Sequence, residues 1–574
     1  MKRYHDSVFW IHSVKIFLKT GILLLLILFL VHLLICLGLV NIFLLDKHGW
    51  MVILKFMGAI IMSNINPDFP ILFTNPDGNT IKTTAQVICN NESIYQMTYW
   101  VLTETNRYFF FSSYIYALFP VGLIILLKGM PSNKKDLHVR GSKLMNSKKF
   151  LNAAKKKNDS LDLPFGSVKM PNSCEAKSSL IIGKPGVGKT VLLAGLFSRL
   201  KQRDVKMIVY DFKGDYVQNF FDPKKDIIFN PFDSRGLDWT LFREIFTPLD
   251  LDAVACSLIP TLEGTSADPF WSDGGRDLFS SILFFLNYHG FRSNSDIWKM
   301  VSSDGKTIAK NLKGTKGCEK GYKYVVEHKS KQALSILAVM MQYCKCFEFM
   351  ADHYGHFSIN EWIEKGTGNI FITNNASVQD SLKPILSVFI DLLARKILSM
   401  PDNTMQKTAF LLDEYTSLQK LPSLIKLLTL GRSKGVSCYL GTQSFGQIEA
   451  LYGRAHKESI INACANQILF SVSGSNTAKE ASAILGEAES IRIEKSFSTG
   501  SDYREGASLA YRNTTEPILL PSEIMGLKDL ECIVKFDNYS PVKSKLQFVE
   551  YPKKNESFIM RPDLMFKTKD KNTK

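Results

Sequence analysis

The 574-residue sequence lacks several features that would assign it to a simple class. It has no long low-complexity segment and no tandem repeat, so a repeat architecture is not expected. Its ten cysteines form no paired framework, which argues against a disulfide scaffold. Cys344 and Cys346 form a C-x-C, but no second Cys/His pair at zinc spacing accompanies it. We therefore expect reduced cysteines and no structural metal.

Acidic residues are also scarce, with 54 against 70 basic residues and a formal net charge of +16. Much of the excess lies between residues 128 and 157 and in the tail after Pro552. One interpretation is a juxtamembrane region that faces an anionic inner leaflet. The other is a path for nucleic-acid phosphates. Because the excess is concentrated in these two places, charge alone argues only weakly for DNA.

Long apolar runs, in contrast, are present near the N-terminus. Residues 21–45 carry no charged residue, and about 25 residues suffice to span a hydrocarbon core of roughly 30 Å. A cleaved signal peptide is a poor alternative, because the run is too long and no small-residue cleavage site follows it. Residues 109–127 form a second predicted span. The shorter run 50–62 contains Lys55, which predicts an interfacial segment or part of a small folded loop.

Basic residues predict the orientation of these spans. Lys2, Arg3, Lys15 and Lys19 precede the first span, and a dense group of lysines and arginines follows the second. The loop at residues 46–108 has only Lys47, Lys55, Lys82 and Arg107. By the positive-inside rule, both termini are predicted to be cytoplasmic and the loop to lie outside.

An octapeptide in the cytoplasmic part fits the phosphate-binding pattern G-x-x-x-x-G-K-[ST]. It consists of Gly183, Lys184, Pro185, Gly186, Val187, Gly188, Lys189 and Thr190. An apolar run at 178–182 predicts a strand before it, and residues 191–197 predict a helix after it. Glycines let several N–H groups point at one phosphate, and the helix dipole adds to the attraction. Lys189 is then expected to reach the β- and γ-phosphates, and Thr190 to bind Mg²⁺. A mere Gly-rich turn is a weak alternative, because a chance match between a strand and a helix is rare.

Two adjacent carboxylates are the expected second half of this site. Residues 408–412 form an apolar run that ends at Asp413 and Glu414. Asp413 is predicted to bind Mg²⁺ through water, and Glu414 to polarise the attacking water. An acidic cap on a strand end is the alternative, which the phosphate loop in the same chain makes less attractive. Gln443, after the run 436–440, is a candidate sensor of the γ-phosphate.

The remaining runs predict the fold. Short apolar segments at 205–210, 368–373 and 467–471 are separated from the others by helix-sized intervals, which favours a parallel, doubly covered sheet. Between residues 246 and 355 strand-like runs disappear and helical spacing replaces them, which predicts an inserted all-α domain. The roughly 450 residues after the second span are enough for two or three domains.

At this point the sequence resembles a family, the type IV secretion coupling proteins and their TraD-like conjugative branch. The likeness runs from His138 to Tyr551. It is carried by Asp211-Phe-Lys-Gly214, Asn230-Pro-Phe-Asp233, Asp268-Pro-Phe-Trp271, Leu412-Asp-Glu-Tyr415, Gly431-Arg-Ser-Lys-Gly435, Gly441-Thr-Gln-Ser444 and Leu520-Pro-Ser-Glu-Ile-Met525. The resemblance implies a multi-pass, hexameric ATPase of the bacterial inner membrane, with a RecA-like motor and an all-α domain. It implies ATP and Mg²⁺ as cofactors. The implied partners are a relaxase bound to single-stranded DNA, double-stranded DNA, secreted proteins and components of the secretion channel.

The resemblance also assigns roles to single residues. Lys189 and Thr190 match the phosphate-loop pair, Asp413 the metal ligand and Glu414 the catalytic carboxylate. Gln443 matches the sensor. Arg432 matches an arginine finger offered to a neighbouring subunit, on a segment expected at the edge of the sheet. A surface arginine that binds DNA, or nothing, is the alternative for Arg432.

The expected organisation follows the chain in order. It comprises a cytoplasmic N-terminus (1–20), a first span (21–45), a periplasmic loop (46–108), a second span (109–127), a basic juxtamembrane segment (128–170), a RecA-like domain (171–245 and 356–552) with an all-α insertion (246–355), and a basic tail (553–574). The tail ends in the short basic run Lys567-Thr-Lys-Asp-Lys571, which is expected to be disordered. It is shorter than the C-terminal extension of some TraD-like proteins, which leaves substrate recruitment open.

Three other functions remain possible at this stage. One is a coupling protein for effector proteins only, and another is a membrane scaffold that binds nucleotide without hydrolysing it. The intact Lys189, Thr190, Asp413 and Glu414 argue against the scaffold. A chromosome-segregation pump is disfavoured by having two predicted spans rather than several.

Overall fold

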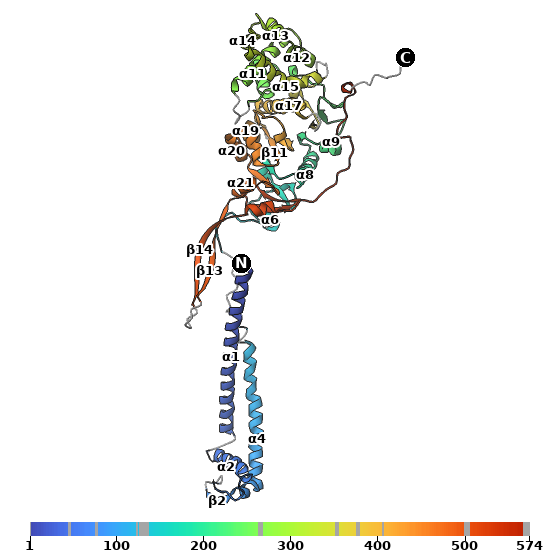
Figure 1. Cartoon of the computed structure of the whole chain (residues 1–574). Helices are drawn as coiled ribbons and strands as arrows, with labels where there is room; N and C mark the ends of the chain where they lie inside the picture. Colours follow the sequence, from blue (N-terminus) through green and yellow to red (C-terminus); the bar gives the residue numbers. More distant parts are fainter. Residues whose placement is uncertain are drawn as a thin grey trace, which may run out of the picture. The chain divides into compact units, whose positions relative to one another are not determined.

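The computed structural model describes residues 2–43, 47–74, 79–121, 124, 137–261, 268–350, 355–374, 379–403, 407–498 and 506–565. The chain divides into two compact units, Met1–Lys135 and Asp136–Lys574 (Figure 1).

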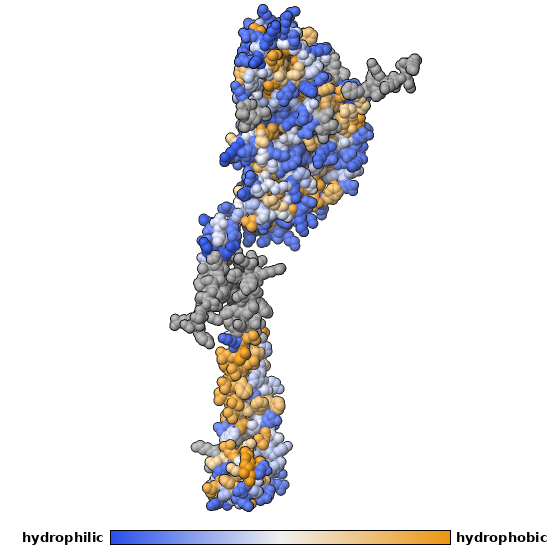
Figure 2. All heavy atoms as spheres, viewed as in Figure 1, coloured by the Kyte–Doolittle hydropathy of each residue, from blue (hydrophilic) through white to orange (hydrophobic). Residues whose placement is uncertain are grey.

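The first unit is built on two long helices. Helix α1 (Lys2–Phe43) contains the apolar stretch Leu18–Ile42, the one helix among the described residues that is long and apolar enough to cross a membrane. Its large aliphatic side chains are exposed, and they form the apolar surface visible along this unit in Figure 2. Helix α4 (Glu92–Ser112) and the 3₁₀ turn η1 (Ser113–Ala117) pack beside α1. The predicted span 109–127 therefore starts inside α4, and its residues 122, 123 and 125–127 lie outside the described part. A second membrane span stays a prediction.

A buried histidine joins the two helices. His32 Nε2 lies 3.1 Å from the Phe109 carbonyl oxygen, and Nδ1 lies 3.2 Å from the Tyr116 hydroxyl. Because the carbonyl can only accept, Nε2 donates and Nδ1 of a neutral ring accepts from Tyr116. The only polar ring of this apolar stretch is thus satisfied within the protein, as burial in an apolar layer requires.

The loop between these helices has a small fold of its own. Helix α2 (Lys47–Ser63) packs on the antiparallel hairpin of β1 (Pro70–Thr74) and β2 (Thr80–Thr84) and on helix α3 (Ala85–Cys89). Val52, Phe56, Phe73 and Ile88 form its core. The run 50–62 therefore belongs to a small folded loop, one of the two alternatives that the sequence left open.

The second unit is organised around a nine-stranded sheet. Its strand order is β16-β15-β12-β6-β11-β10-β7-β9-β8. The bounds are β6 Ser179–Ile182, β7 Lys206–Asp211, β8 Ile227–Phe229, β9 Ile370–Thr373, β10 Thr408–Leu412, β11 Val436–Thr442, β12 Asn466–Leu469, β15 Glu531–Lys535 and β16 Val542–Lys545. Strands β12 to β8 are parallel, but β15 and β16 are antiparallel to their neighbours. The sheet is therefore mixed, and the sequence prediction of a parallel sheet is wrong at this edge.

Alternation along the strands gives the sheet two buried faces. Leu180 and Ile182 join one core, whereas Ile181 between them joins the other. The first face is covered by α17 (Gln379–Ser399), α18 (Leu424–Leu430), α19 (Phe445–Tyr452), α20 (Arg454–Ala463) and α21 (Ser475–Leu485). The second is covered by α6 (Ser147–Lys156), α8 (Lys189–Gln202), α9 (Asp215–Phe220) and the hairpin of β4 (Leu161–Phe165) and β5 (Val168–Pro171). Burial on both faces explains why the central strands are continuously apolar.

Packing on the second face shows that the expected juxtamembrane segment (128–170) is in part a portion of the folded domain. Residues 147–171 fold onto the sheet, with Phe150 of α6 and Leu163 and Phe165 of β4 fully buried. Helix α6 buries Phe150 and Ala154, four residues apart, while its lysines stay on the surface. The sequence analysis considered only the charge of this segment and therefore missed the amphipathic spacing of its apolar residues.

Helices replace strands after β8, as the sequence predicts. Those that Figure 1 labels, α11 to α15, gather at one end of the second unit. The helices are α10 (Pro248–Leu258), α11 (Pro269–Tyr288), α12 (Asn294–Val301), α13 (Gly305–Leu312), α14 (Glu319–Val325), α15 (Lys331–Cys344), η3 (Lys345–Phe349) and α16 (Ile359–Lys365). Cys344 and Cys346 are buried at the end of α15 and in η3.

A long hairpin projects from this unit and was not predicted. Strands β13 (Glu487–Ser498) and β14 (Gly506–Pro517) pair along twelve positions each, and β3 (Leu137–Gly141) pairs with the base of β13. The alternation in these strands is too polar to stand out as a strand signal.

The segment after β16 also differs from expectation. Residues 552–565, here called the C-terminal strap, run along the second unit, so the first part of the predicted basic tail (553–574) is packed against it. The strap binds α9 through the Lys554 N–H on the Gln218 carbonyl (2.9 Å), and the loop after β8 through Ser234 N–H on the Ile559 carbonyl (2.8 Å). The basic residues 567–571 lie outside the described part.

Candidate functional site

The parallel strands bring the predicted site residues to one edge of the sheet. Strand β11 lies between β6, which leads into the phosphate loop, and β10, which leads into Asp413 and Glu414. The three strands run in the same direction, so their carboxyl ends meet. Gln443 follows β11 and therefore lies between the other two groups. This is the edge at which open α/β sheets bind their ligands.

The phosphate loop has the backbone that the glycines predict. Gly186 has a φ of 81° and Gly188 a φ of 115°, both in the left-handed region. A Cβ atom on Gly188 would lie 2.8 Å from Cδ2 of Leu530. The N–H groups of Gly183 and Lys184 bond to neighbouring strand ends, at Thr442 and Ser471.

The rest of the loop keeps its donors available. Within the described residues, the N–H groups of Gly186, Val187 and Gly188 have no hydrogen-bond acceptor. Helix α8 begins at the next residue, so its positive end faces the same space. Free N–H groups beside a helix N-terminus form a cradle for an anion, which fits a nucleotide phosphate.

Lys189 and Thr190 point to the two sides of this cradle. The Lys189 ammonium is buried and lies 2.5 Å from the Gly183 carbonyl oxygen, inside the loop. Burial lowers the pKa of Lys189, and the carboxylates of Glu414 and Asp413 oppose this effect. The Thr190 hydroxyl donates to Asp413 Oδ2 at 2.8 Å. A hydroxyl and a carboxylate in contact are the oxygen ligands that Mg²⁺ prefers, so these two residues fit that ion.

The two carboxylates differ in their surroundings. Asp413 is held by Thr190, and burial raises its pKa. A Cβ atom on Gly441 of β11 would lie 3.2 Å from Asp413 Oδ1, so glycine lets the strand pass close to the carboxylate. Glu414 has a φ of 63°, a left-handed conformation that is costly for a residue with a side chain.

Gln443 is brought to Glu414. Burial raises the pKa of Glu414, while a hydrogen bond from the Gln443 side chain favours its ionised form. The candidate sensor and the candidate catalytic carboxylate are therefore in direct contact. Their pairing could not be predicted from sequence distance, since 29 positions of chain separate them (443 − 414).

Arg432 lies apart from these residues. It is exposed in the 3₁₀ turn η5 (Gly431–Lys434), which enters β11 at its amino end. The seven residues of β11 put about 23 Å between that end and the nucleotide edge. The segment connects β10 to β11, and both are interior strands of the sheet. The expectation that it lies beside an outer strand is therefore wrong. A parallel neighbour forces the connection to return to the opposite end of the sheet.

Three residues at the site had no assigned role in the sequence. Asp211 ends β7, is buried, and accepts the N–H groups of Gly214 and Val217, both at 2.9 Å. Burial raises the pKa of Asp211 to about 7. The Tyr216 hydroxyl lies 3.5 Å from Asp413 Oδ2, and Lys213 acts electrostatically on both site carboxylates. The sequence did contain a signal for these residues, because the charged residues Asp211, Lys213 and Asp215 directly follow the predicted strand 205–210.

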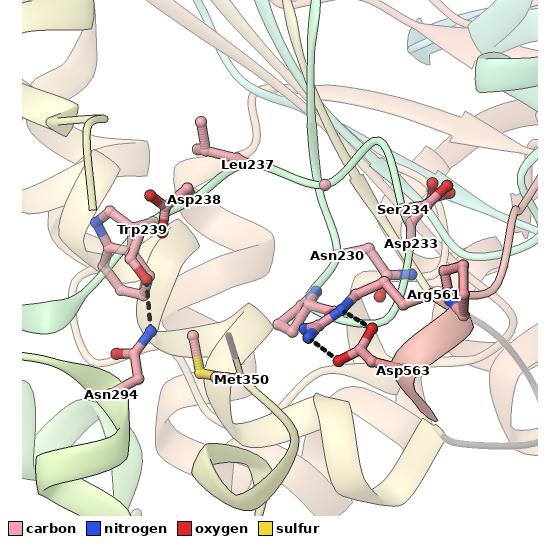
Figure 3. Close-up of a pocket in the computed structure, with 13 residues that line it drawn as sticks. Asn230, Asp233, Ser234, Leu237, Asp238, Trp239, Asn294, Met350, Arg561 and Asp563 are labelled. Carbon is pink, nitrogen blue, oxygen red and sulfur yellow. Dashed lines mark hydrogen bonds and ion pairs between the residues drawn. The ribbon is translucent and has the colours of Figure 1, made fainter. Parts of the chain in front are cut away.

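A separate cavity of about 440 Å³ lies at the far end of the sheet (Figure 3). Its walls are the loop after β8, the all-α region and the C-terminal strap. Asn294 Nδ2 donates to the Trp239 carbonyl on one side, and Arg561 pairs with Asp563 on the other. Strand β8 is five positions from β6, roughly 24 Å, so this cavity is distinct from the nucleotide edge.

Comparison with known sequences gives a family and relatives. A profile of the family described as type IV secretion-system coupling protein DNA-binding domain matches residues 162–546. Coupling protein TraD of Escherichia coli (strain K12) is 30% identical over 427 residues, which is 72% of this chain. The match covers 59% of that relative, so the chain spans about six tenths of its length.

Solved structures agree with this result. The bacterial conjugative coupling protein TrwBdeltaN70, in its unbound monoclinic form, is 27% identical with a TM-score of 0.66, over 75% of this chain and 98% of that one. Plasmid coupling protein TrwB in complex with ADP and Mg²⁺ is 26% identical with a TM-score of 0.65, over 75% of this chain and 99% of that one.

Proposed function

Because the chain belongs to the family of type IV secretion-system coupling proteins, we propose that it is a membrane-bound ATPase that couples DNA to a secretion channel during conjugation. One observation carries the proposal. A phosphate cradle, two carboxylates and a glutamine from three neighbouring strands meet at one edge of the sheet. A scaffold that only binds nucleotide has no need of Glu414 in a strained backbone against Gln443.

The residues divide the work as follows. Residues 183–190 hold the phosphates, with Lys189 at the β- and γ-phosphates, and Thr190 and Asp413 hold Mg²⁺, which when bound neutralises charge on the phosphates. Glu414 orients and polarises the attacking water, and Gln443 reports on the γ-phosphate. A nucleotide and a divalent ion are supported by the complex of TrwB with ADP and Mg²⁺.

Two substitutions separate binding from hydrolysis. Lys189→Ala removes the ammonium from the cradle and should abolish binding of a fluorescent ATP analogue. Glu414→Gln keeps the cradle and the side-chain volume, so binding should persist while hydrolysis falls about 10²-fold or more. Asp204→Asn, at a turn outside the site, serves as the control that changes one carboxylate to an amide. Normal hydrolysis by Glu414→Gln would mean that another group polarises water.

The substrate is proposed to be a relaxase-bound single strand. The family profile is described as a DNA-binding domain, and the similar solved structure TrwBdeltaN70 is a bacterial conjugative coupling protein. ATPase activity should therefore rise with added DNA, and DNA binding should be sequence-tolerant and weaken with salt as counterions return to the phosphates. ATPase activity that ignores every DNA but responds to a secreted protein would favour a coupling protein for effectors only.

Arg432 is proposed to act on a neighbouring subunit of a homohexamer. Its distance of about 23 Å from its own nucleotide edge rules out action within one chain in this conformation. Arg432→Ala should bind the ATP analogue and fail to hydrolyse ATP. Mixing it with Lys189→Ala should restore part of the activity, because an intact finger can then face an intact loop. Mixtures without recovery would leave Arg432 a surface or structural residue.

The chain is further proposed to be a protein of the bacterial inner membrane with two spans and cytoplasmic termini. Support comes from the apolar stretch of α1, the packing of α4 and η1 beside it, and the basic residues outside both spans. Contact of the two helices through His32 is consistent with a pair that crosses together.

A further inference from the structure

Gln447 occupies a helix-capping position near the start of α19 (Phe445–Tyr452). Helix α19 starts after Ser444, whose hydroxyl accepts the Gln447 N–H at 3.2 Å. The spacing Ser-x-x-Gln is that of a capping box, in which the glutamine side chain would return to the N–H of the serine. A purely structural role would end with that bond.

The Gln447 side chain goes elsewhere. Its Oε1 atom accepts the backbone N–H of Gln443 at 3.2 Å, the Thr442 hydroxyl at 3.0 Å and the Thr416 hydroxyl at 3.2 Å. The two threonine hydroxyls also lie 3.2 Å apart. One oxygen therefore gathers donors from the end of β11 and from the turn after β10.

These donors belong to the two halves of the candidate hydrolytic pair. Thr416 lies two residues after Glu414, in the 3₁₀ turn η4 (Tyr415–Ser417). Gln443 is the residue whose side chain bonds to Glu414. Gln447 thus binds the backbone N–H of Gln443 and the side chain of Thr416, two residues after Glu414, although it is not itself among the groups that contact Glu414.

We propose that Gln447 is a positioning residue that holds Gln443 against Glu414 and so sets the geometry for the attacking water. This proposal rests on the proposed ATPase function. The strained backbone of Glu414 explains why a clamp is needed, because a left-handed residue relaxes unless its surroundings hold it. Catalytic groups lose effectiveness when their supporting contacts are loose.

Two variants of the full-length chain test the role of the Gln447 Oε1 atom as a hydrogen-bond acceptor. Gln447→Met keeps the length of the side chain and removes the acceptor, and Gln447→Glu keeps an acceptor in the same place. With Gln447→Met, kcat should fall by up to about 10²-fold while KM and the affinity for a non-hydrolysable ATP analogue stay unchanged. Gln447→Glu should recover most of that loss.

A control separates positioning from helix capping. Ser444→Ala removes the cap bond to Gln447 but leaves the three bonds to its side chain. It should lower the thermal midpoint at least as much as Gln447→Met does, with little change in kcat. Equal losses of kcat in Ser444→Ala and Gln447→Met would overturn the proposal, because helix stability would then explain both.

Hydrogen exchange gives a readout independent of hydrolysis. The Gln443 amide should exchange faster in Gln447→Met and at the wild-type rate in Gln447→Glu. In a Glu414→Gln background, Gln447→Met should reduce kcat no further, since both act on the same step. Unchanged exchange at Gln443 would refute the clamp even if the wild type hydrolyses ATP. A wild type without ATPase activity would refute the proposed function, and the exchange rates alone would then decide whether Gln447 holds Gln443.

Discussion

Removing the Arg561 guanidinium should loosen the attachment of the C-terminal strap to two parts of the second unit. Its Nη1 donates to the Pro231 carbonyl at 2.9 Å, in the loop after β8, and to the Phe349 carbonyl at 3.1 Å, in η3 of the all-α region. The same side chain pairs with Asp563 (Figure 3). Arg561→Ala therefore removes a bridge between the sheet and the helices.

The size of the effect follows from these contacts. A hydrogen bond from a charged donor contributes about 1.5–3 kcal/mol, which gives roughly 3–6 kcal/mol for two. Pro231 and Arg561 line the neighbouring cavity of about 440 Å³, where water can replace part of the lost contacts, so the lower end applies, at about 3 kcal/mol. The pair with Asp563 adds little, because the Asp563 side chain is 59% exposed.

The assay is denaturant unfolding together with hydrogen exchange of residues 552–565. Arg561→Ala should lower the midpoint and speed exchange along the strap. Asp563→Asn, which removes only the exposed ion pair, should cost less than about 1 kcal/mol. Arg561→Lys should resemble Ala, because a single ammonium cannot replace the planar fork. An Arg561→Ala chain with wild-type unfolding and exchange would refute a bridging role for the strap.

Three further predictions test the membrane unit, the loop and the sheet edge. A reporter fused near Thr80 should be periplasmic and one near Lys157 cytoplasmic, and a cytoplasmic signal at Thr80 would contradict the charge argument. Gly188→Ala should cost about 1–3 kcal/mol and abolish binding of a fluorescent ATP analogue, because its Cβ atom meets Leu530 and its φ is 115°. Burial raises the pKa of Asp211 from 3.8 to about 7, so the folded chain keeps this proton to a higher pH than the unfolded chain. That stability is complete below pH 3.8 and is lost as the pH rises through about 7. In metal-free buffer, the thermal midpoint should fall between about pH 4 and pH 7, and Asp211→Asn should flatten this slope.

The parallel strands of the sheet could be predicted because they are short apolar runs bounded by polar residues. Strands β6, β7, β9, β10, β11 and β12 each lie within about two residues of an expected run. The phosphate loop was identified for a similar reason, since glycines with positive φ leave a direct trace in the sequence. The antiparallel edge was missed because β15 and β16 carry no separate signal for direction.

The strap and α6 show where composition misleads. Helix α6 is rich in lysine and the strap contains Lys553, Lys554 and Arg561, so the sequence predicted only a basic segment and a basic tail. The strap is held by backbone bonds and by Asn555, whose Nδ2 donates to the Phe221 carbonyl at 2.8 Å. Backbone donors and acceptors are the same in every sequence, so a strap of this kind has no pattern of its own.

The sequence alone determined the chemistry available to this protein: a phosphate loop, a pair of carboxylates and an apolar helix near the N-terminus. It determined these because each depends on residue type over a short stretch, through glycine backbone freedom, carboxylate charge and hydrophobic length. The tertiary structure alone decided which of these groups meet. The order β6-β11-β10 brings Gln443 to Glu414 and puts Arg432 at the opposite end of the same strand. Contacts between segments far apart in the chain depend on strand order and on packing across the sheet, and no local pattern of residues encodes them.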